Sequence, residues 1–237
     1  MSRRTLFGAT ASAAAAAALV AGATPAAATP GRRTNDPRAT PLNADQAWRK
    51  LVAGNDRFVA GKQKHPHESL AWRESLVAGQ NPFAVVLSCA DSRVSPELVF
   101  DEGLGDLFVI RAAGEVLDTA VVGSIEYAIE HLGVPLIVIV GHQSCGAVGA
   151  AIELVQHNAE FTGDIATLVR TIEPAVRATP ANNNADAFFD ACVAEQARRA
   201  AKYLQERSNI ISNAVAHHGV KVFSATYELE TGKVTKL

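Results

Sequence analysis

The chain has 237 residues, a formal net charge of −2 and 48% hydrophobic residues, a composition that excludes disordered and collagen-like proteins. The near balance of 22 Lys+Arg against 24 Asp+Glu argues against a nucleic-acid-binding protein, which usually carries a basic surplus. Three cysteines are too few for a disulfide scaffold, and no apolar run is hydrophobic and long enough to predict a membrane-spanning segment.

Residues 1–30 are predicted to be an export signal peptide that is not part of the fold. The pair Arg3-Arg4 is followed by an Ala-rich stretch over residues 9–23 and by three alanines at 26–28. This is the order of a charged region, a weakly apolar region and a small-residue cleavage site, and the arginine pair is typical of a twin-arginine signal. We therefore expect an exported protein in the periplasm, the cell envelope or the medium. The alternative is a disordered, low-complexity tail.

Residues 31–41 are rich in Pro, Thr and Arg and are predicted to be a flexible linker, which leaves residues 42–237 for one folded domain. Helices are predicted where apolar residues recur with the helical period, and strands where short apolar runs show no alternation, as in strands buried on both faces. In chain order the predicted elements are helices over 43–61 and 68–78, strands over 83–88 and 107–110, a helix over 119–132, a strand over 136–140, helices over 146–156 and about 186–216, a strand over 220–226 and an edge hairpin over 227–237. Strands separated by helices predict an α/β fold with a mostly parallel central sheet, about four parallel strands plus an antiparallel edge strand, flanked by helices.

Two short segments carry side chains suited to chemistry. Cys89, Asp91 and Arg93 directly follow one predicted strand, and His142 and Cys145 directly follow another. The carboxyl ends of parallel strands meet at one edge of a sheet, where ligands bind, so the two segments are expected to lie close together. Two thiolates with an imidazole and a carboxylate form a good tetrahedral zinc set. Asp91 could reach the same ion, or it could pair with the Arg93 guanidinium instead.

The cysteines also have simpler interpretations. Cys89 and Cys145 could form a disulfide in an exported protein, or either could be an inert buried thiol. The pattern Cys-x-Asp-x-Arg with His-x-x-Cys, each after a strand, favours the metal site over both. Cys192 falls four residues after Phe188 in the apolar phase of a predicted helix, and it is predicted to pack in the core.

The chain resembles the beta-class carbonic anhydrases over nearly the whole length that follows the signal. The matching stretches are Cys-Ala-Asp-Ser-Arg-Val at 89–94, Gly-Asp-Leu-Phe-Val-Ile-Arg at 105–111, Gly-Ser-Ile-Glu-Tyr-Ala at 123–128 and Gly-His-Gln-Ser-Cys-Gly-Ala-Val at 141–148. The resemblance implies one Zn²⁺ per subunit on Cys89, His142 and Cys145, with a catalytic Asp91–Arg93 dyad beside it. In a closed state Asp91 would leave Arg93 and become the fourth zinc ligand.

The resemblance also implies a substrate site and an activity. Gln80 would orient carbon dioxide or bicarbonate, Phe108 and Tyr127 would line the cleft at a subunit interface, and the N–H of Gly146 would contact the substrate. The implied assembly is a homodimer or homotetramer whose N-terminal helices pack on a partner subunit. The implied enzyme is a carbonate dehydratase, a zinc lyase that hydrates carbon dioxide reversibly to bicarbonate and a proton by means of a zinc-bound hydroxide. A hydrolase of carbonyl sulfide or carbon disulfide on the same scaffold, or a non-catalytic exported zinc-binding protein, remains an alternative.

Overall fold

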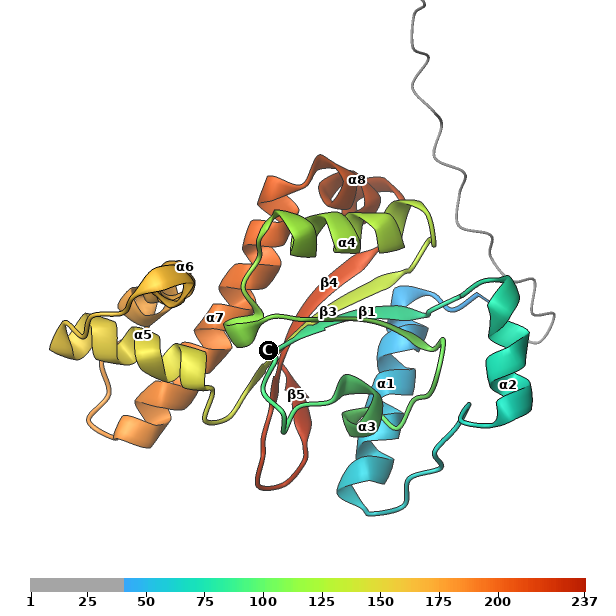
Figure 1. Cartoon of the computed structure of the whole chain (residues 1–237), viewed down its shortest axis with the longest axis horizontal. Helices are drawn as coiled ribbons and strands as arrows, with labels where there is room; N and C mark the ends of the chain where they lie inside the picture. Colours follow the sequence, from blue (N-terminus) through green and yellow to red (C-terminus); the bar gives the residue numbers. More distant parts are fainter. Residues whose placement is uncertain (1–40) are drawn as a thin grey trace, which may run out of the picture.

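A five-stranded sheet runs through the centre of the molecule (Figure 1), and the computed structural model describes residues 41–237. Its strands are β1 (Ala84–Ser88), β2 (Leu107–Arg111), β3 (Leu136–His142), β4 (Lys221–Tyr227) and β5 (Val234–Lys236). They lie in the order β2-β1-β3-β4-β5, with every neighbouring pair parallel except β4 and β5. The predicted sheet of four parallel strands with an antiparallel edge strand is confirmed.

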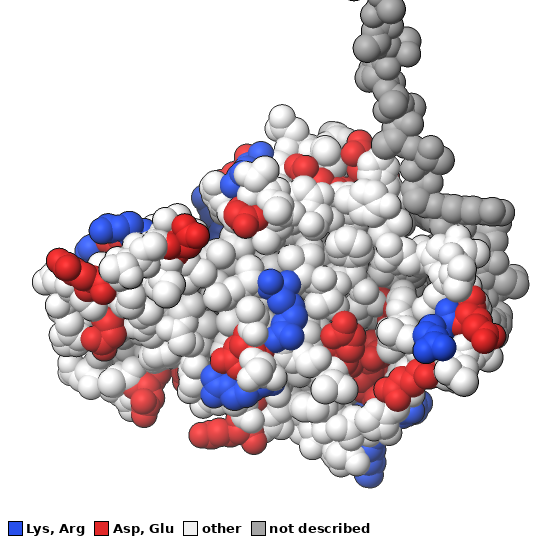
Figure 2. Space-filling view, viewed as in Figure 1, with Lys and Arg blue, Asp and Glu red and all other residues white. Residues whose placement is uncertain are grey.

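Helices cover both faces of this sheet and extend beyond its carboxyl end. They are α1 (Ala44–Val59), α2 (Leu70–Ser75), α3 (Pro96–Val99), α4 (Thr119–Glu130), α5 (Gly146–His157), α6 (Gly163–Ala178), α7 (Ala185–Arg207) and α8 (Asn209–His217), with 3₁₀ turns η1 (Leu76–Ala78) and η2 (Ala113–Glu115). On the side shown in Figure 2, acidic and basic residues are interspersed among uncharged ones. No helix within residues 41–237 combines the length and the apolar character needed to cross a bilayer.

Two core clusters sandwich the sheet, because alternate residues of each strand point to opposite faces. Val85 and Leu87 pack with α4, α7 and α8, whereas Ala84 and Val86 pack with α1. Figure 1 shows α4 and α8 on one side of the sheet and α1 on the other. All residues of β1 and β3 are buried, as their unbroken apolar runs predict.

A third cluster lies beyond the carboxyl ends of the strands, where α5, α6 and part of α7 pack together. It joins Cys89 and Cys145 to apolar residues of these helices, including Val148, Ile172 and Cys192. The core position predicted for Cys192 is confirmed, since its side chain is fully buried. This layer is the part of the fold that borders the predicted metal site.

The helix α6 is not among the elements predicted from the sequence. Its buried residues Val169, Ile172 and Val176 follow the helical period, so the signal was present. Pro174 inside the helix removes one backbone donor and lowers the local helical preference. Packing of these apolar residues against α5 and α7 in the third cluster outweighs that cost.

The single long helix predicted over 186–216 is wrong, because the chain breaks at Ser208 into α7 and α8. Ser208 has an extended backbone (φ −104°, ψ 113°), and its Oγ accepts a hydrogen bond from the N–H of Ile211 at 3.2 Å. The same hydroxyl donates to Oε1 of Glu126 on α4 at 2.6 Å. Serine is a preferred helix N-cap, so this side chain starts α8 in a new direction.

The two N-terminal helices differ in how much of their surface is buried within the chain. α1 begins at the predicted capping box, in which Asn43 and Gln46 exchange hydrogen bonds at 2.9 Å, and it packs on its own sheet. α2 is shorter than predicted and has no buried residue.

The partner contact predicted for these N-terminal helices stays a prediction, and so does the predicted division of the chain into signal peptide, linker and folded domain. The signal peptide at 1–30 and nearly all of the linker at 31–41 lie outside the described residues.

Candidate metal centre

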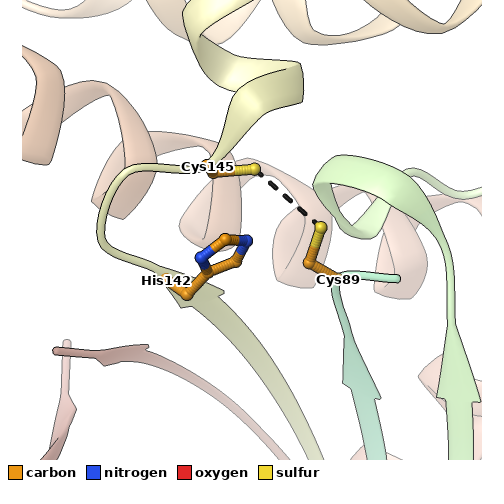
Figure 3. A group of neighbouring side chains, drawn as sticks. All are labelled: Cys89, His142 and Cys145. Atoms are coloured by element: carbon orange, nitrogen blue, oxygen red, sulfur yellow. Dashed lines mark hydrogen bonds between the residues drawn. The ribbon is translucent and has the colours of Figure 1, made fainter. Parts of the chain in front are cut away.

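Three side chains converge where the central strands end (Figure 3). Cys89 directly follows β1, His142 is the last residue of β3, and Cys145 is the N-cap of α5. Ser88 at the end of β1 pairs in register with Val140 of β3, which brings the two segments side by side. The sequence prediction that both segments meet at this edge of the sheet is confirmed.

The predicted ligand atoms are close enough to share one ion. One ligand atom from each of Cys89, His142 and Cys145 lies within 4.8 Å of the other two, and the two sulfur atoms are 4.0 Å apart. All three side chains are buried, and both thiols are free. The disulfide interpretation therefore does not describe this structure, whereas two sulfurs and an imidazole nitrogen match the donors that Zn²⁺ prefers.

The imidazole of His142 tests whether the site fits a metal. Its Nδ1 donates to the carbonyl of Gln143 at 2.9 Å, which leaves the lone pair on Nε2. Nε2 is buried and has no hydrogen-bond partner among the described residues. Buried polar atoms are rarely left without a partner, and a backbone bond to the other ring nitrogen is typical of a metal-ligating histidine. The residues therefore fit a metal ion.

The cluster also favours a thiolate. The hydrogen bond from Cys145 lowers the pKa of Cys89 to about 4, and contacts with His142 and the backbone N–H of Gly114 act in the same direction against the effect of burial. The pKa of Cys145 is raised by the same hydrogen bond and by burial. The hydrogen bond between the two sulfurs therefore favours a thiolate within the pair.

Asp91 and Arg93 form the predicted pair at the rim of the cluster. Arg93 donates from Nε to Oδ1 of Asp91 at 2.9 Å and from Nη2 to Oδ2 at 2.7 Å, and its own backbone N–H reaches Oδ1 at 2.9 Å. These bonds hold the pKa of Asp91 well below its usual range. Oδ2 of Asp91 lies 4.0 Å from Nε2 of His142, so the carboxylate stands beside the ligand atoms and remains bound to Arg93.

Arg111 was not assigned to this site from the sequence. It ends β2 opposite Ser88, and its guanidinium donates to the carbonyls of Cys89, at 3.0 Å, and of Asp91. One arginine thus forms hydrogen bonds with both ends of the Cys89–Asp91 segment. Arg111 ends the matching stretch at 105–111, but its contacts follow from the register of β1 and β2, which is set by strand pairing and not by that stretch.

The predicted substrate residues are spread more widely. Gly146 is the first residue of α5, and no described atom lies within 4 Å of the place where a Cβ would stand. Phe108 of β2 and Tyr127 of α4 are neighbours, with ring centroids 6.5 Å apart. Gln80 is exposed and precedes β1, so five residues of strand, roughly 16 Å, separate its segment from Cys89. A single chain therefore brings together the ligands, the dyad and Gly146, but not Gln80.

Comparisons with known proteins agree on one family. The sequence model of a family described as carbonic anhydrase matches residues 84–234. Carbonic anhydrase 2 of Mycobacterium tuberculosis is 43% identical over 193 residues, which cover 81% of this chain and 91% of that protein. The carbonic anhydrase of Mycolicibacterium smegmatis is 40% identical over 198 residues, which cover 84% and 94%.

Solved structures share the fold. A tetrameric beta-carbonic anhydrase of the fungus Sordaria macrospora superposes with a TM-score of 0.65 at 21% identity, covering 80% of this chain and 96% of that one. A Coccomyxa beta-carbonic anhydrase in complex with acetazolamide gives a TM-score of 0.59 at 25% identity, covering 81% and 82%. Together with the Cys89–His142–Cys145 cluster, these matches show that the chain belongs to the beta-class carbonic anhydrases.

Proposed function

We propose that this enzyme hydrates carbon dioxide reversibly to bicarbonate and a proton, with one Zn²⁺ per subunit held by Cys89, His142 and Cys145. The observation that carries the proposal is the convergence of two free, buried thiols on a buried imidazole nitrogen that has no other partner. When bound, Zn²⁺ supplies a Lewis acid that lowers the pKa of water toward neutrality. The remaining steps depend on residues of the chain.

Asp91 orients the reacting water. Its carboxylate is kept ionised by the Arg93 fork, so at neutral pH it can only accept a hydrogen bond, and this fixes the direction of the water's lone pair. Arg93 also donates to the carbonyl of Ser144 at 3.2 Å, which ties the dyad to the segment that carries His142 and Cys145. If the fork opened, Asp91 could turn to the metal and close the site.

Gly146 is placed to stabilise charge on the substrate oxygens. Its N–H lies in the first turn of α5, where backbone donors have no partner within the helix and the helix dipole favours negative charge. The lack of a Cβ leaves the approach open. Bicarbonate is the charged species of the reaction, so this end of the helix suits it.

Gln80, Phe108 and Tyr127 complete the substrate cleft in this proposal. Because Gln80 lies toward the far end of β1 from the cluster, we propose that it serves the site of a neighbouring subunit in a homodimer or homotetramer. The exposed side chains of Leu70 on α2 and Val77 on η1, in the segment that precedes Gln80, support a contact of this kind. The Sordaria macrospora relatives are described as tetrameric.

We also propose export through a twin-arginine signal. The support is the order of features at Arg3-Arg4, residues 9–23 and residues 26–28. Zinc binding requires reduced thiolates and contributes folding energy. Folding and metal loading before export would protect Cys89 and Cys145 from oxidation.

The decisive test measures metal and activity together. Purified protein should hold one zinc per chain, X-ray absorption should show two sulfur neighbours at about 2.3 Å, and stopped-flow assays should show rapid hydration of carbon dioxide. Carbonyl sulfide and carbon disulfide should be tested in parallel. A zinc-loaded protein that hydrolyses either and leaves carbon dioxide unhydrated would overturn the proposed substrate, and a shell without sulfur would overturn the ligand set.

A further inference from the structure

A buried glutamine on α7 reaches the turn that borders the metal cluster. Gln196 is 5% exposed, and its Nε2 donates to the carbonyl oxygen of Gly114 at 2.9 Å. The two residues are 82 positions apart, and the residues of α7 buried around Gln196 are apolar. A buried amide needs a partner to offset the cost of leaving water, and this carbonyl is the partner that the structure provides.

The turn that receives this bond has an uncommon backbone. Gly114 and Glu115 both lie in the left-handed region, with φ of +63° and +41°. At Gly114 a Cβ would stand 2.5 Å from Cδ1 of Ile172, and the positive φ would strain a residue with a side chain, so the position favours glycine. Left-handed residues other than glycine are strained, and they persist where the surroundings hold them in place.

The same glycine faces the metal cluster. The N–H of Gly114 donates to Sγ of Cys89 at 3.3 Å, while its carbonyl accepts from Gln196. Both backbone groups of one residue are therefore in use, the first on a predicted metal ligand and the second on α7. The N–H and the carbonyl of Gly114 belong to two peptide planes that meet at its Cα, and glycine rotates easily about φ and ψ. The bond from Gln196 anchors the second plane and so limits the rotation that would move the N–H away from Cys89.

We propose that Gln196 is a positioning residue of the metal centre, which holds the Gly114–Glu115 turn so that the Gly114 N–H stays on the sulfur of Cys89. The proposal rests on the proposed function only in taking Cys89 as a metal ligand. A hydrogen bond to a thiolate stabilises its charge and fixes its orientation, and loss of such outer partners typically weakens metal binding about 10- to 100-fold. Gln196 itself touches neither the ligand atoms nor the substrate.

The test replaces Gln196 with Met in the full-length protein, which keeps the volume and removes the amide. Affinity for Zn²⁺ is measured by competition with a chelator, and the sulfur-to-metal charge-transfer bands are recorded after loading with Co²⁺. We expect affinity about tenfold weaker and shifted bands. Gln196→Asn, which keeps an amide that is one methylene too short, should behave in the same way.

Two control variants separate positioning from general stability. Gln205→Met removes a similar amide-to-carbonyl bond on the same helix, to Ala201 at 2.9 Å, away from the turn. Leu204→Ala destabilises the core cluster on the sheet face without touching the turn. Both should bind Co²⁺ with wild-type affinity and wild-type bands.

The outcomes are distinct. If Gln196→Met binds Zn²⁺ within about twofold of the wild type with unchanged bands, or if Leu204→Ala weakens binding equally, the inference is wrong. If neither Gln196 variant folds, the bond is purely structural and the inference is again wrong. If the wild type shows no sulfur-to-metal bands at all, the proposed function fails instead, which keeps the two failures apart.

Discussion

The guanidinium of Arg93 engages both carboxylate oxygens of Asp91, with Nη2 at 2.7 Å from Oδ2 and Nε at 2.9 Å from Oδ1. A two-point contact of this kind fixes the plane of the carboxylate as well as its charge. The orientation of the Asp91 carboxylate at the rim of the metal cluster therefore depends on both residues.

Asp91→Ala and Arg93→Ala should each keep the metal and lose most of the activity. Neither residue belongs to the three-ligand set, and loss of one preorganised polar group typically costs roughly 10²–10³ in turnover. Zinc content and the rate of carbon dioxide hydration are measured on the same samples. Arg170→Ala, which removes an exposed arginine of α6, is the matched control. Near-normal rates in zinc-loaded Asp91→Ala would contradict the role given to the dyad.

His142→Ala should abolish stable zinc binding. The substitution removes the imidazole nitrogen that has no other partner in the described chain, and it leaves only two thiols for the ion. Metal content after dialysis against a weak chelator should fall close to zero, while circular dichroism reports whether the fold is kept. Cys192→Ala, at the third buried cysteine, should retain one zinc per chain. Full zinc occupancy in His142→Ala would rule out the ligand assignment.

Arg111→Lys should lower the turnover number and leave zinc in place. Lysine keeps the positive charge but lacks the planar fork that reaches the carbonyls of Cys89 and Asp91 together. We expect a loss of about tenfold, since the segment that carries the dyad loses one of its two contacts with β2. The rate is compared at equal zinc content. An unchanged rate would mean that strand pairing alone holds the segment.

Glu102→Gln should flatten the dependence of stability on pH. Burial raises the pKa of Glu102 to about 7, although Lys50 lies 2.9 Å away and opposes the shift. A carboxyl whose pKa is raised by folding stabilises the protein below its unfolded pKa, and that contribution is lost as pH rises through the folded pKa. The wild type should therefore lose on the order of 2 kcal/mol between about pH 4.5 and pH 7 from this group. Urea unfolding across this range compares the two proteins, and parallel curves would contradict the assignment.

Changing Arg3-Arg4 to Lys-Lys should trap an uncleaved, active enzyme inside the cell. The twin-arginine pathway depends on the arginine pair, and the enzyme domain itself is unchanged. Cell fractionation and mass spectrometry locate the protein and its N-terminus. Export and processing at the wild-type level in the Lys-Lys variant would show that the signal is of another type.

The sequence was sufficient wherever a local pattern decides the structure. The unbroken apolar runs of β1 and β3 predicted buried parallel strands, and the strand ends placed Cys89 and His142 together. The capping pair of Asn43 and Gln46 likewise marked the start of α1. In each of these cases a pattern within a few neighbouring residues predicts the element that the structure contains.

The parts that were missed depend on contacts between distant segments. Ser208 interrupts an apolar pattern that continues on both sides, and its second partner, Glu126, is 82 residues away. The bond from Gln196 to Gly114 also spans 82 residues, and glutamic acid is an unexpected residue for the left-handed backbone that follows. The residues that flank Ser208 and Gln196 in the sequence contain no pattern that predicts either contact.

The third core cluster predicts which part of the protein unfolds locally when the metal is removed. Cys89 follows β1 and Cys145 starts α5, so a shared ion would fasten the α5–α6 layer to the end of the sheet. Removal of that ion should release the layer first. Amide hydrogen exchange should then quicken within Gly146–His157 and Gly163–Ala178, while the strands Ala84–Ser88 and Leu136–His142 stay protected.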